Sequence, residues 1–183
     1  GNTSCLEVIC GENRLIMDAG SGLPMLGRKM LSEEIKRPTK VFLTHTHLDH
    51  IIGMPFFAPF HIPGNTVPVH AGHLKSFGMS LHEVMSGMMR APLFPVPPEI
   101  FGARVDFIDF DSGETLEPFE GTVLRTAPLN HPNGACGYRI EHGGKSICYI
   151  TDTEHFPDRL DDNIVNLVAN ADIMIYDATY TDD

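Results

Sequence analysis

The chain has 183 residues, of which 42% are hydrophobic and 20% are charged. This composition is ordinary for a globular protein, and the length predicts a single domain over residues 1–183. The formal net charge is −11 with histidines neutral, which argues against a surface built for nucleic-acid phosphates, because such surfaces are rich in Lys and Arg. The best apolar run, residues 51–60, is broken by Pro55 and Pro59, so we expect no membrane-spanning segment.

The cysteines and the N-terminus bear on cellular location. The four cysteines form no CxxC pair and no dense framework: Cys5, Cys10, Cys136 and Cys148. We therefore expect reduced, mostly buried thiols in a cytoplasmic protein. The chain begins at Gly1 rather than Met and continues at once as a strand, so we expect that its true N-terminus lies upstream, with or without a signal peptide.

The first half of the chain alternates short apolar segments with turn residues. The pattern predicts two strands joined by a turn (residues 5–11 and 13–20), a short helix (22–31) and a strand that leads into a histidine cluster (40–44). Another strand (67–72), a Met-rich amphipathic helix (74–89) and an ordered proline-rich loop (91–102) follow. Helical spacing of apolar residues is the signal for both helices.

The second half continues with strands and ends in a helix and a strand. The strands are expected at residues 104–110, 122–127, 137–141 and 146–151, the helix at 161–171 with Asp161 or Asp162 as N-cap, and a buried strand at 172–179. Gly143-Gly144 predicts a hairpin turn. The order of elements in the whole chain fits an α/β protein with two sheets covered by outer helices.

The segment with most chemical information is LTHTHLDHIIG, residues 43–53, which places three histidines and an aspartate within six positions. In an extended segment, side chains two apart face the same side, so His45 and His47 can point at one ion. Where the chain then turns into a helix, Asp49 and His50 project toward a neighbouring point. The loop can therefore supply imidazole and carboxylate ligands to two adjacent metal ions. The alternative is a histidine-rich surface loop with incidental metal affinity, and the apolar strand before the cluster argues against it.

The segment HTHLDH resembles the H-x-H-x-D-H signature of the metallo-β-lactamase superfamily. The resemblance covers nearly the whole chain. The segment LIMDAGSG, with Asp18, resembles the strand that precedes the signature in that family. His131 in APLNHPNGACGYRI resembles the family's third histidine ligand, and Asp152 in SICYITDTEH resembles its bridging aspartate. The segment DATY, residues 177–180, resembles the strand end before a last histidine ligand, which would lie beyond Asp183. By this resemblance we expect a four-layer αββα sandwich that lacks its first strand and its C-terminal end.

The resemblance also implies the metal ligands, which are His45, His47, Asp49, His50, His131 and Asp152. His45, His47 and His131 would hold one ion, Asp49 and His50 the other, and Asp152 would bridge both, because a carboxylate has two oxygens to offer. Asp18 is expected to support the ligands from behind rather than to bind metal. His155 either contacts substrate or a supporting water, or has no role in the site. Two divalent cations are expected, with zinc as the first choice and manganese or iron as alternatives.

This chemistry indicates a hydrolase in which Asp49 orients an activated water or takes its proton. The flanking motifs resemble the branch of tRNase Z, cyclic-nucleotide phosphodiesterases and related small phosphodiesterases. The acidic charge and the lack of a basic arm argue against tRNase Z itself, so we expect a small anionic phosphodiester or cyclic nucleotide as substrate. The alternatives are a thioesterase, lactonase or lactamase, and a non-catalytic metal-binding or ligand-sensing module. Related proteins are often dimers, so a homodimer is a possible assembly.

Overall fold

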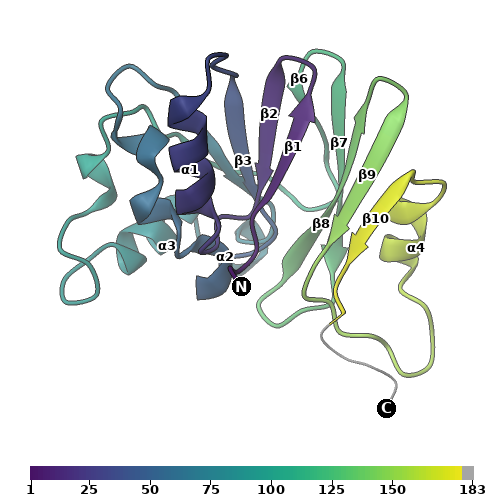
Figure 1. Ribbon diagram of the computed structural model, residues 1–183. Helices are drawn as coiled ribbons and strands as arrows, with labels where there is room; N and C mark the ends of the chain where they lie inside the picture. The colour runs from purple at the N-terminus through teal and green to yellow at the C-terminus, as the bar shows by residue number, and fades with distance from the viewer. Residues whose placement is uncertain (179–183) are drawn as a thin grey trace. The chain divides into compact units, whose positions relative to one another are not determined.

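The computed structural model describes residues 1–178, which form two compact units, residues 1–110 and residues 111–178. Each unit holds one five-stranded sheet; several helices pack against the first sheet, and one helix of the described residues packs against the second (Figure 1). The predicted α/β class with two sheets is therefore confirmed. No helix in the described part of the chain is both long and apolar enough to cross a membrane.

The sheet of the first unit is mostly parallel. Its strands are β1 (Leu6–Cys10), β2 (Asn13–Met17), β3 (Thr39–Leu43), β4 (Val69–Ala71) and β5 (Phe107–Asp109). They lie in the order β1-β2-β3-β4-β5, with β1 antiparallel to β2 and the other neighbours parallel. The carboxyl ends of β2 to β5 therefore meet at one edge, which is where open α/β sheets bind ligands.

Helices and short 3₁₀ turns cover this sheet on one face. They are α1 (Leu23–Ser32), α2 (Leu48–Ile51), η1 (Met54–Phe56), η2 (Ala58–His61), η3 (Lys75–Phe77), α3 (Leu81–Met88) and η4 (Pro98–Ile100). In α1, Leu23, Leu26 and Met30 are buried, as their spacing predicts. They share a core with Val41 of β3 and Val69 of β4.

The helix predicted at residues 74–89 is interrupted. The turn η3 ends at Gly78, which has a left-handed φ of 68°. A new helix, α3, then begins after Ser80, whose side chain accepts a hydrogen bond from the backbone N–H of Glu83 while the Glu83 carboxylate accepts one from the backbone N–H of Ser80. The prediction of one continuous helix was wrong because the apolar spacing runs across a glycine that ends one turn and a capping box that starts another.

The second unit is built on a meander. Its strands are β6 (Thr115–Phe119), β7 (Thr122–Leu129), β8 (Ala135–His142), β9 (Lys145–Ile150) and β10 (Ile173–Tyr176), and its helix is α4 (Asp162–Val168). Strands β6 to β9 are antiparallel neighbours, and β10 pairs with β9 in parallel. Gly143 and Gly144, with φ of 57° and 73°, form the predicted hairpin turn between β8 and β9. The side chain of Asp161 accepts a hydrogen bond from the N–H of Asn163, which confirms Asp161 as the N-cap.

Two strands of this unit differ from the prediction. No strand was predicted at β6, which contains Pro118. In the described part of the chain β6 is an edge strand, and an edge strand tolerates proline because one side of it makes no ladder hydrogen bonds. The strand at residues 172–179 was predicted as buried, but Ile173 and Met174 of β10 are 53% and 52% exposed. In the described part of the chain β10 is an edge strand. Residues 179 and 180 of the DATY segment lie outside the described residues.

Candidate metal centre

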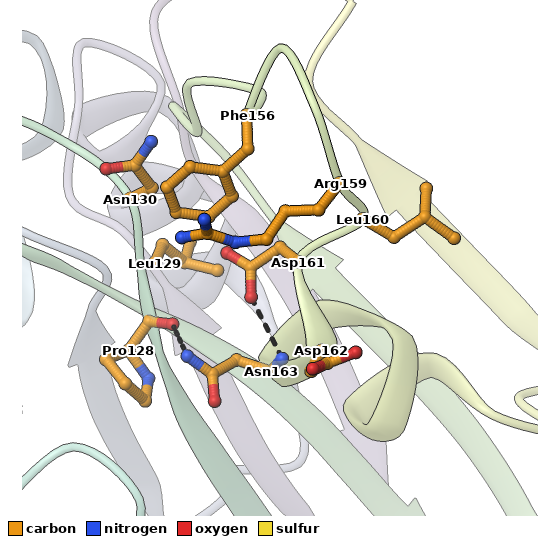
Figure 2. Close-up of a pocket in the computed structure, with 9 residues that line it drawn as sticks. All are labelled: Pro128, Leu129, Asn130, Phe156, Arg159, Leu160, Asp161, Asp162 and Asn163. Atoms are coloured by element: carbon orange, nitrogen blue, oxygen red, sulfur yellow. Dashed lines mark hydrogen bonds between the residues drawn. The ribbon is translucent and has the colours of Figure 1, made fainter.

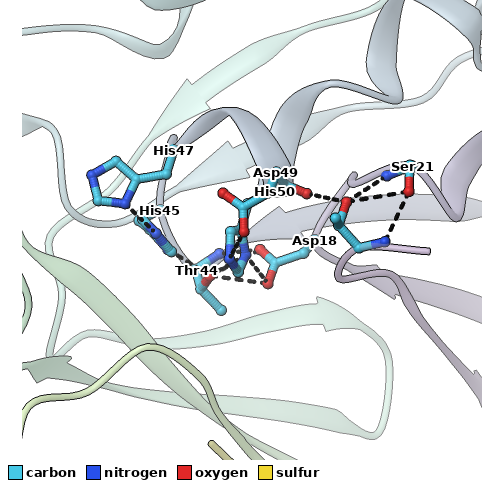
Figure 3. A network of polar contacts seen from close by, with 8 residues as sticks. Asp18, Ser21, Thr44, His45, His47, Asp49 and His50 are labelled. Carbon is cyan, nitrogen blue, oxygen red and sulfur yellow. Dashed lines mark hydrogen bonds and ion pairs between the residues drawn. The ribbon is translucent and has the colours of Figure 1, made fainter. Parts of the chain in front are cut away.

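The histidine cluster lies at the carboxyl end of β3 in the first unit (Figure 3). The backbone is extended through His47, with φ −62° and ψ 150°, and α2 starts at the next residue. His45 and His47 therefore project from extended chain, whereas Asp49 and His50 project from the first helical turn. This is the local conformation that the sequence predicts, and it is why one short loop presents two groups of ligands.

The four side chains form two pairs of metal-binding atoms. Nε2 of His45 lies 2.9 Å from Nδ1 of His47, with the rings nearly perpendicular. Nε2 of His50 lies 3.3 Å from Oδ2 of Asp49. The rings of His45 and His50 are 99% buried, but the Asp49 side chain is 55% exposed and reachable by solvent. Each pair places two ligand atoms close enough to share one cation, so the residues present fit a metal centre.

Asp18 lies behind this cluster, directly after β2. Its carboxylate is fully buried and accepts hydrogen bonds from the N–H and the hydroxyl of Thr44, at 2.7 and 3.0 Å. Nδ1 of His50 lies 2.9 Å from Asp18 Oδ2. A carboxylate at Nδ1 favours the tautomer with the proton on that nitrogen, which directs the lone pair of Nε2 toward Asp49. The structure thus places Asp18 where it orients a predicted ligand, and its functional role stays a prediction.

Thr44 is a part of this network that sequence reasoning missed. Its hydroxyl lies 3.1 Å from Nδ1 of His45 and 3.4 Å from Nδ1 of His50. Together with its bonds to Asp18, this links the inner nitrogens of two predicted ligands on different ions. Nothing in the sequence distinguishes Thr44 from an ordinary strand residue, because its role depends on Asp18, which is 26 positions away.

The backbone of α2 is fixed from the loop that carries Asp18. The N–H of Ala19 donates to the carbonyl of His50 at 2.8 Å, and the N–H of Gly53 donates to the carbonyl of Ala19 at 2.9 Å. A Cβ at Gly53 would collide with the carbonyl oxygen of Gly20, and one at Gly20 with that of Asp49. These glycines are needed because the two backbones approach too closely for any side chain.

The N-terminal segment also contacts the backbone of α2. The hydroxyl of Thr3 donates to the carbonyl of Asp49 at 2.6 Å. Thr3 is itself held by Ser21, since each backbone N–H donates to the hydroxyl of the other residue at 2.8 Å. The position of Asp49 is therefore fixed at its backbone while its carboxylate stays exposed.

His73 follows β4 and approaches the cluster from the neighbouring strand. Its Nε2 lies 3.0 Å from the hydroxyl of Thr46, and its ring centre is 6.5 Å from that of His45. Burial, with a smaller contribution from His47, lowers the pKa of His73 to about 4.

The second unit carries the other predicted ligands. Strands β7 and β9 both run antiparallel to β8 and so point the same way, and His131 and Asp152 each lie two residues beyond their ends. The two loops are joined, since the N–H of Glu154 donates to the carbonyl of Asn130 at 2.7 Å and the amide of Asn130 donates to the carbonyl of Glu154 at 2.9 Å. His131 and Asp152 therefore come from adjoining loops. Asp152 has a left-handed φ of 46°.

His155 is paired with the last described strand. Its Nε2 lies 2.9 Å from the hydroxyl of Tyr176 in β10, and the two rings are stacked with centres 5.9 Å apart. Burial, followed by the charges of Asp177 and Asp161, raises the pKa of the Tyr176 hydroxyl. The hydroxyl thus keeps its proton at neutral pH.

A cavity of about 320 Å³ opens beside these loops (Figure 2). The end of β7 with Asn130 forms one wall, and the segment from Phe156 to Asn163 forms the rest. The guanidinium carbon of Arg159 lies 4.0 Å from the centre of the Phe156 ring. The Arg159 side chain is 62% exposed, so it presents a positive charge to solvent on the loop that follows Asp152.

The chain matches the model of a known protein family. The model of a family described as a β-lactamase superfamily domain matches residues 13–183. A ribonuclease Z from Exiguobacterium sibiricum is 27% identical over 146 residues, which are 76% of this chain and 43% of the relative. The chain therefore spans less than half of that relative's length.

Two solved structures share the fold. The metallo-β-lactamase fold protein YhfI from Bacillus subtilis has a TM-score of 0.67 and 20% identity over 99% of this chain and 66% of its own. The Zn²⁺-bound PqqB from Methylobacterium extorquens has a TM-score of 0.64 and 20% identity over 97% of this chain and 58% of its own. At this level of identity, the likeness is one of fold.

Proposed function

Because the chain belongs to the metallo-β-lactamase superfamily, in a branch related to ribonuclease Z, we propose that it is a metal-dependent hydrolase that cleaves a small phosphodiester. The observation that carries the proposal is the presence of two separate pairs of metal-binding atoms on one loop. His45 and His47 form the first pair, and His50 and Asp49 form the second. A loop with one metal ion would need only one such pair.

We assign the remaining ligands from the second unit. His131 would complete the first set and Asp152 would bridge the two, since both follow strands that end at the same edge of their sheet. Zinc is the first choice, because imidazoles dominate the set and the PqqB structure of the same fold is zinc-bound. Manganese and iron remain alternatives. When bound, divalent cations activate water as a nucleophile and stabilise negative charge on substrate oxygens.

The chain's own residues have separable roles in this proposal. Asp49 has an exposed carboxylate on a fixed backbone, so it can orient the attacking water or accept its proton. Asp18 keeps Nε2 of His50 available as a ligand by occupying its other nitrogen. Thr44 couples the orientation of His50 to that of His45.

A small anionic phosphodiester, such as a cyclic nucleotide, is the substrate that these features favour. The relative is named a ribonuclease Z, which acts on phosphodiester bonds, but the net charge of −11 disfavours a long polyanion. Arg159 supplies an exposed positive charge beside the adjoining loops of the second unit. Three further statements stay predictions: the protein does not bind nucleic acid, it forms a homodimer, and it is cytoplasmic.

The test is turnover by the intact protein supplied with Zn²⁺ or Mn²⁺. We expect hydrolysis of bis(p-nitrophenyl) phosphate, and slow or no turnover of a thioester or of nitrocefin. Activity on the carbonyl substrates alone would replace the proposal with a thioesterase, lactonase or lactamase. No turnover, together with one ion or none per chain, would favour a metal-binding module.

Two variants separate chemistry from metal loss. Asp49→Asn should lower kcat by about 100-fold or more, because it removes the proposed base and weakens the site of the second ion, while the ion at His45 and His47 still binds. Asp152→Ala should lower the metal content as well as the activity, because it removes the proposed bridge. Asp106→Asn, at a partly exposed position in the first unit, is the matched control for loss of one carboxylate.

A further inference from the structure

We propose that His73 is a positioning residue, which holds the side chain of Thr46 and thereby aims His45 and His47 at their shared cation. The inference rests on the proposed function in one respect, namely that a metal ion binds at this pair. It adds a residue that lies outside the H-x-H-x-D-H segment and outside the set of ligands.

The argument begins with the alternation of side chains in extended backbone. His45 and His47 face one side, so Thr46 between them faces the opposite side. On that side the hydroxyl of Thr46 lies 3.0 Å from Nε2 of His73. An anchor on Thr46 therefore restrains the segment from behind and leaves its front to the ligands.

The strands explain why His73 reaches this position. β3 and β4 are parallel neighbours, and Leu43 pairs with Ala71 at their carboxyl ends. Thr46 lies three residues beyond Leu43, and His73 lies two beyond Ala71. The two chains leave the sheet side by side, so the contact follows from the sheet and does not depend on a long flexible loop.

The burial of His73 favours a specific role over simple filling of the core. The residue is only 5% exposed, and its Nδ1 is buried without a hydrogen-bond partner among the described residues. A buried polar atom without a partner costs about 1–3 kcal/mol, so an apolar side chain would pack here at lower cost. The bond to Thr46 is the interaction that an apolar side chain could not make.

The same facts favour one direction for the hydrogen bond between His73 and Thr46. Unpaired buried N–H groups are rarer in proteins than unpaired acceptors, which favours the tautomer with the proton on Nε2. In that tautomer His73 donates to the Thr46 hydroxyl and leaves a lone pair at Nδ1. Nε2 is then occupied and Nδ1 is buried, so His73 acts through Thr46 and not as a ligand.

The test compares four variants in the intact protein. His73→Phe keeps a ring without a donor, His73→Gln keeps a donor, Thr46→Val removes the hydroxyl at nearly constant volume, and a fourth variant combines His73→Phe with Thr46→Val. His82→Phe is the control, because its side chain is 59% exposed on α3. The measurements are Zn²⁺ affinity by competition with a chromophoric chelator, and the visible spectrum of the Co²⁺-loaded protein.

We expect His73→Phe and Thr46→Val each to weaken Zn²⁺ binding by about 10-fold, at the lower end of the range for residues that support a ligand. The double variant should be no weaker than either single one, because both remove the same interaction. His73→Gln should stay within about 3-fold of wild type, and its Co²⁺ spectrum should match. The control should match wild type throughout.

Wild-type affinity and spectrum in folded His73→Phe would overturn the inference. So would additive losses in the double variant, or a His73→Gln protein as weak as His73→Phe, since these outcomes indicate packing alone. If His73→Phe does not fold, Thr46→Val decides, because unchanged affinity there leaves His73 nothing to act through. A coupled loss of affinity in a protein without phosphodiesterase activity would refute only the proposed function, whereas a wild type that binds no metal would refute both.

Discussion

Asp18 Oδ2 and His50 Nδ1 lie 2.9 Å apart, although the residues are 32 positions apart in the chain and both are essentially inaccessible to solvent. A buried carboxylate is costly unless donors surround it. Here Thr44 supplies two of these donors, from its backbone N–H and its hydroxyl, and His50 supplies the third. These contacts offset the free-energy cost of burying the Asp18 carboxylate, and they also set the orientation of His50, a predicted ligand.

Asp18→Asn should weaken metal binding by about 10- to 100-fold with little change in fold. Asparagine tolerates the left-handed φ of 61° at this position, but its neutral amide is a weaker partner for Nδ1 of His50. Chelator competition measures the affinity, and thermal unfolding checks the fold. The control is Asp106→Asn, and equal affinities in the two variants would show that Asp18 does not support the metal centre.

Two glycine substitutions, one in the close backbone packing around α2 and one in α3, should have opposite effects on the free energy of unfolding. Gly53→Ala should lower the free energy of unfolding by about 1–3 kcal/mol, because its Cβ would overlap the rigid carbonyl of Gly20. Gly87→Ala in α3 should raise it by about 0.5–1 kcal/mol, since nothing lies within 4 Å of the added atom and alanine favours helix. Urea unfolding measures both. A neutral Gly53→Ala would mean that the Asp18 loop and α2 separate easily.

The sequence predicted the parts of the site that depend on neighbouring residues. The change from extended chain to helix after His47 is visible in the order of residues, because alternation and a helical turn are both local patterns. Resemblance to a family added Asp18, His131 and Asp152, which no local pattern connects to the histidine cluster.

The sequence could not reveal residues whose role arises from tertiary contact. Thr44 and His73 each look like ordinary residues at a strand end, and their contacts come from segments 26 and 27 positions away. Strand β6 was missed because its pattern is broken by Pro118 and irregular pairing. The exposure of β10 escaped prediction because an apolar run indicates burial whether or not a further element covers it.

A buried arginine supports the amino end of the first sheet and predicts a pH dependence. Arg14 is 2% exposed and pairs with Glu7 at 2.7 Å and Glu33 at 2.6 Å, while Lys29 also contacts Glu7. Burial alone would raise the pKa of Glu7, but hydrogen bonds from Lys29 and Arg14 outweigh it, so the pKa is lowered from 4.5. The unfolded chain therefore binds the proton more strongly than the folded chain does.

The free energy of unfolding should accordingly fall as the pH drops below about 4.5 toward the lower pKa of folded Glu7. Above that window the contribution is fully present. Glu7→Gln should lower stability at neutral pH by about 1–3 kcal/mol, because a hydrogen bond to a charged group is weakened, and should flatten the decline in acid. Urea unfolding between pH 7 and pH 3 tests this, with the exposed Glu34→Gln as control. An unchanged acid slope in Glu7→Gln would contradict the assignment.

Arg159 gives a prediction about substrate charge. Its guanidinium is exposed, stacks on Phe156 and lines a cavity with Asn130, the neighbour of His131. An exposed ionic contact contributes up to about 1 kcal/mol, so Arg159→Gln should raise KM for bis(p-nitrophenyl) phosphate by about 5-fold and leave kcat nearly unchanged.

The control and the salt dependence make this prediction specific. Arg104→Gln removes another exposed arginine charge, in the first unit, and should leave KM as it is. The difference between Arg159→Gln and wild type should shrink as salt rises, because screening weakens exposed charge interactions. Arg159→Lys keeps the charge but not the planar group over Phe156, so its KM should lie between the values of wild type and Arg159→Gln. A KM that changes equally in Arg104→Gln, or a change confined to kcat, would show that Arg159 does not attract the substrate.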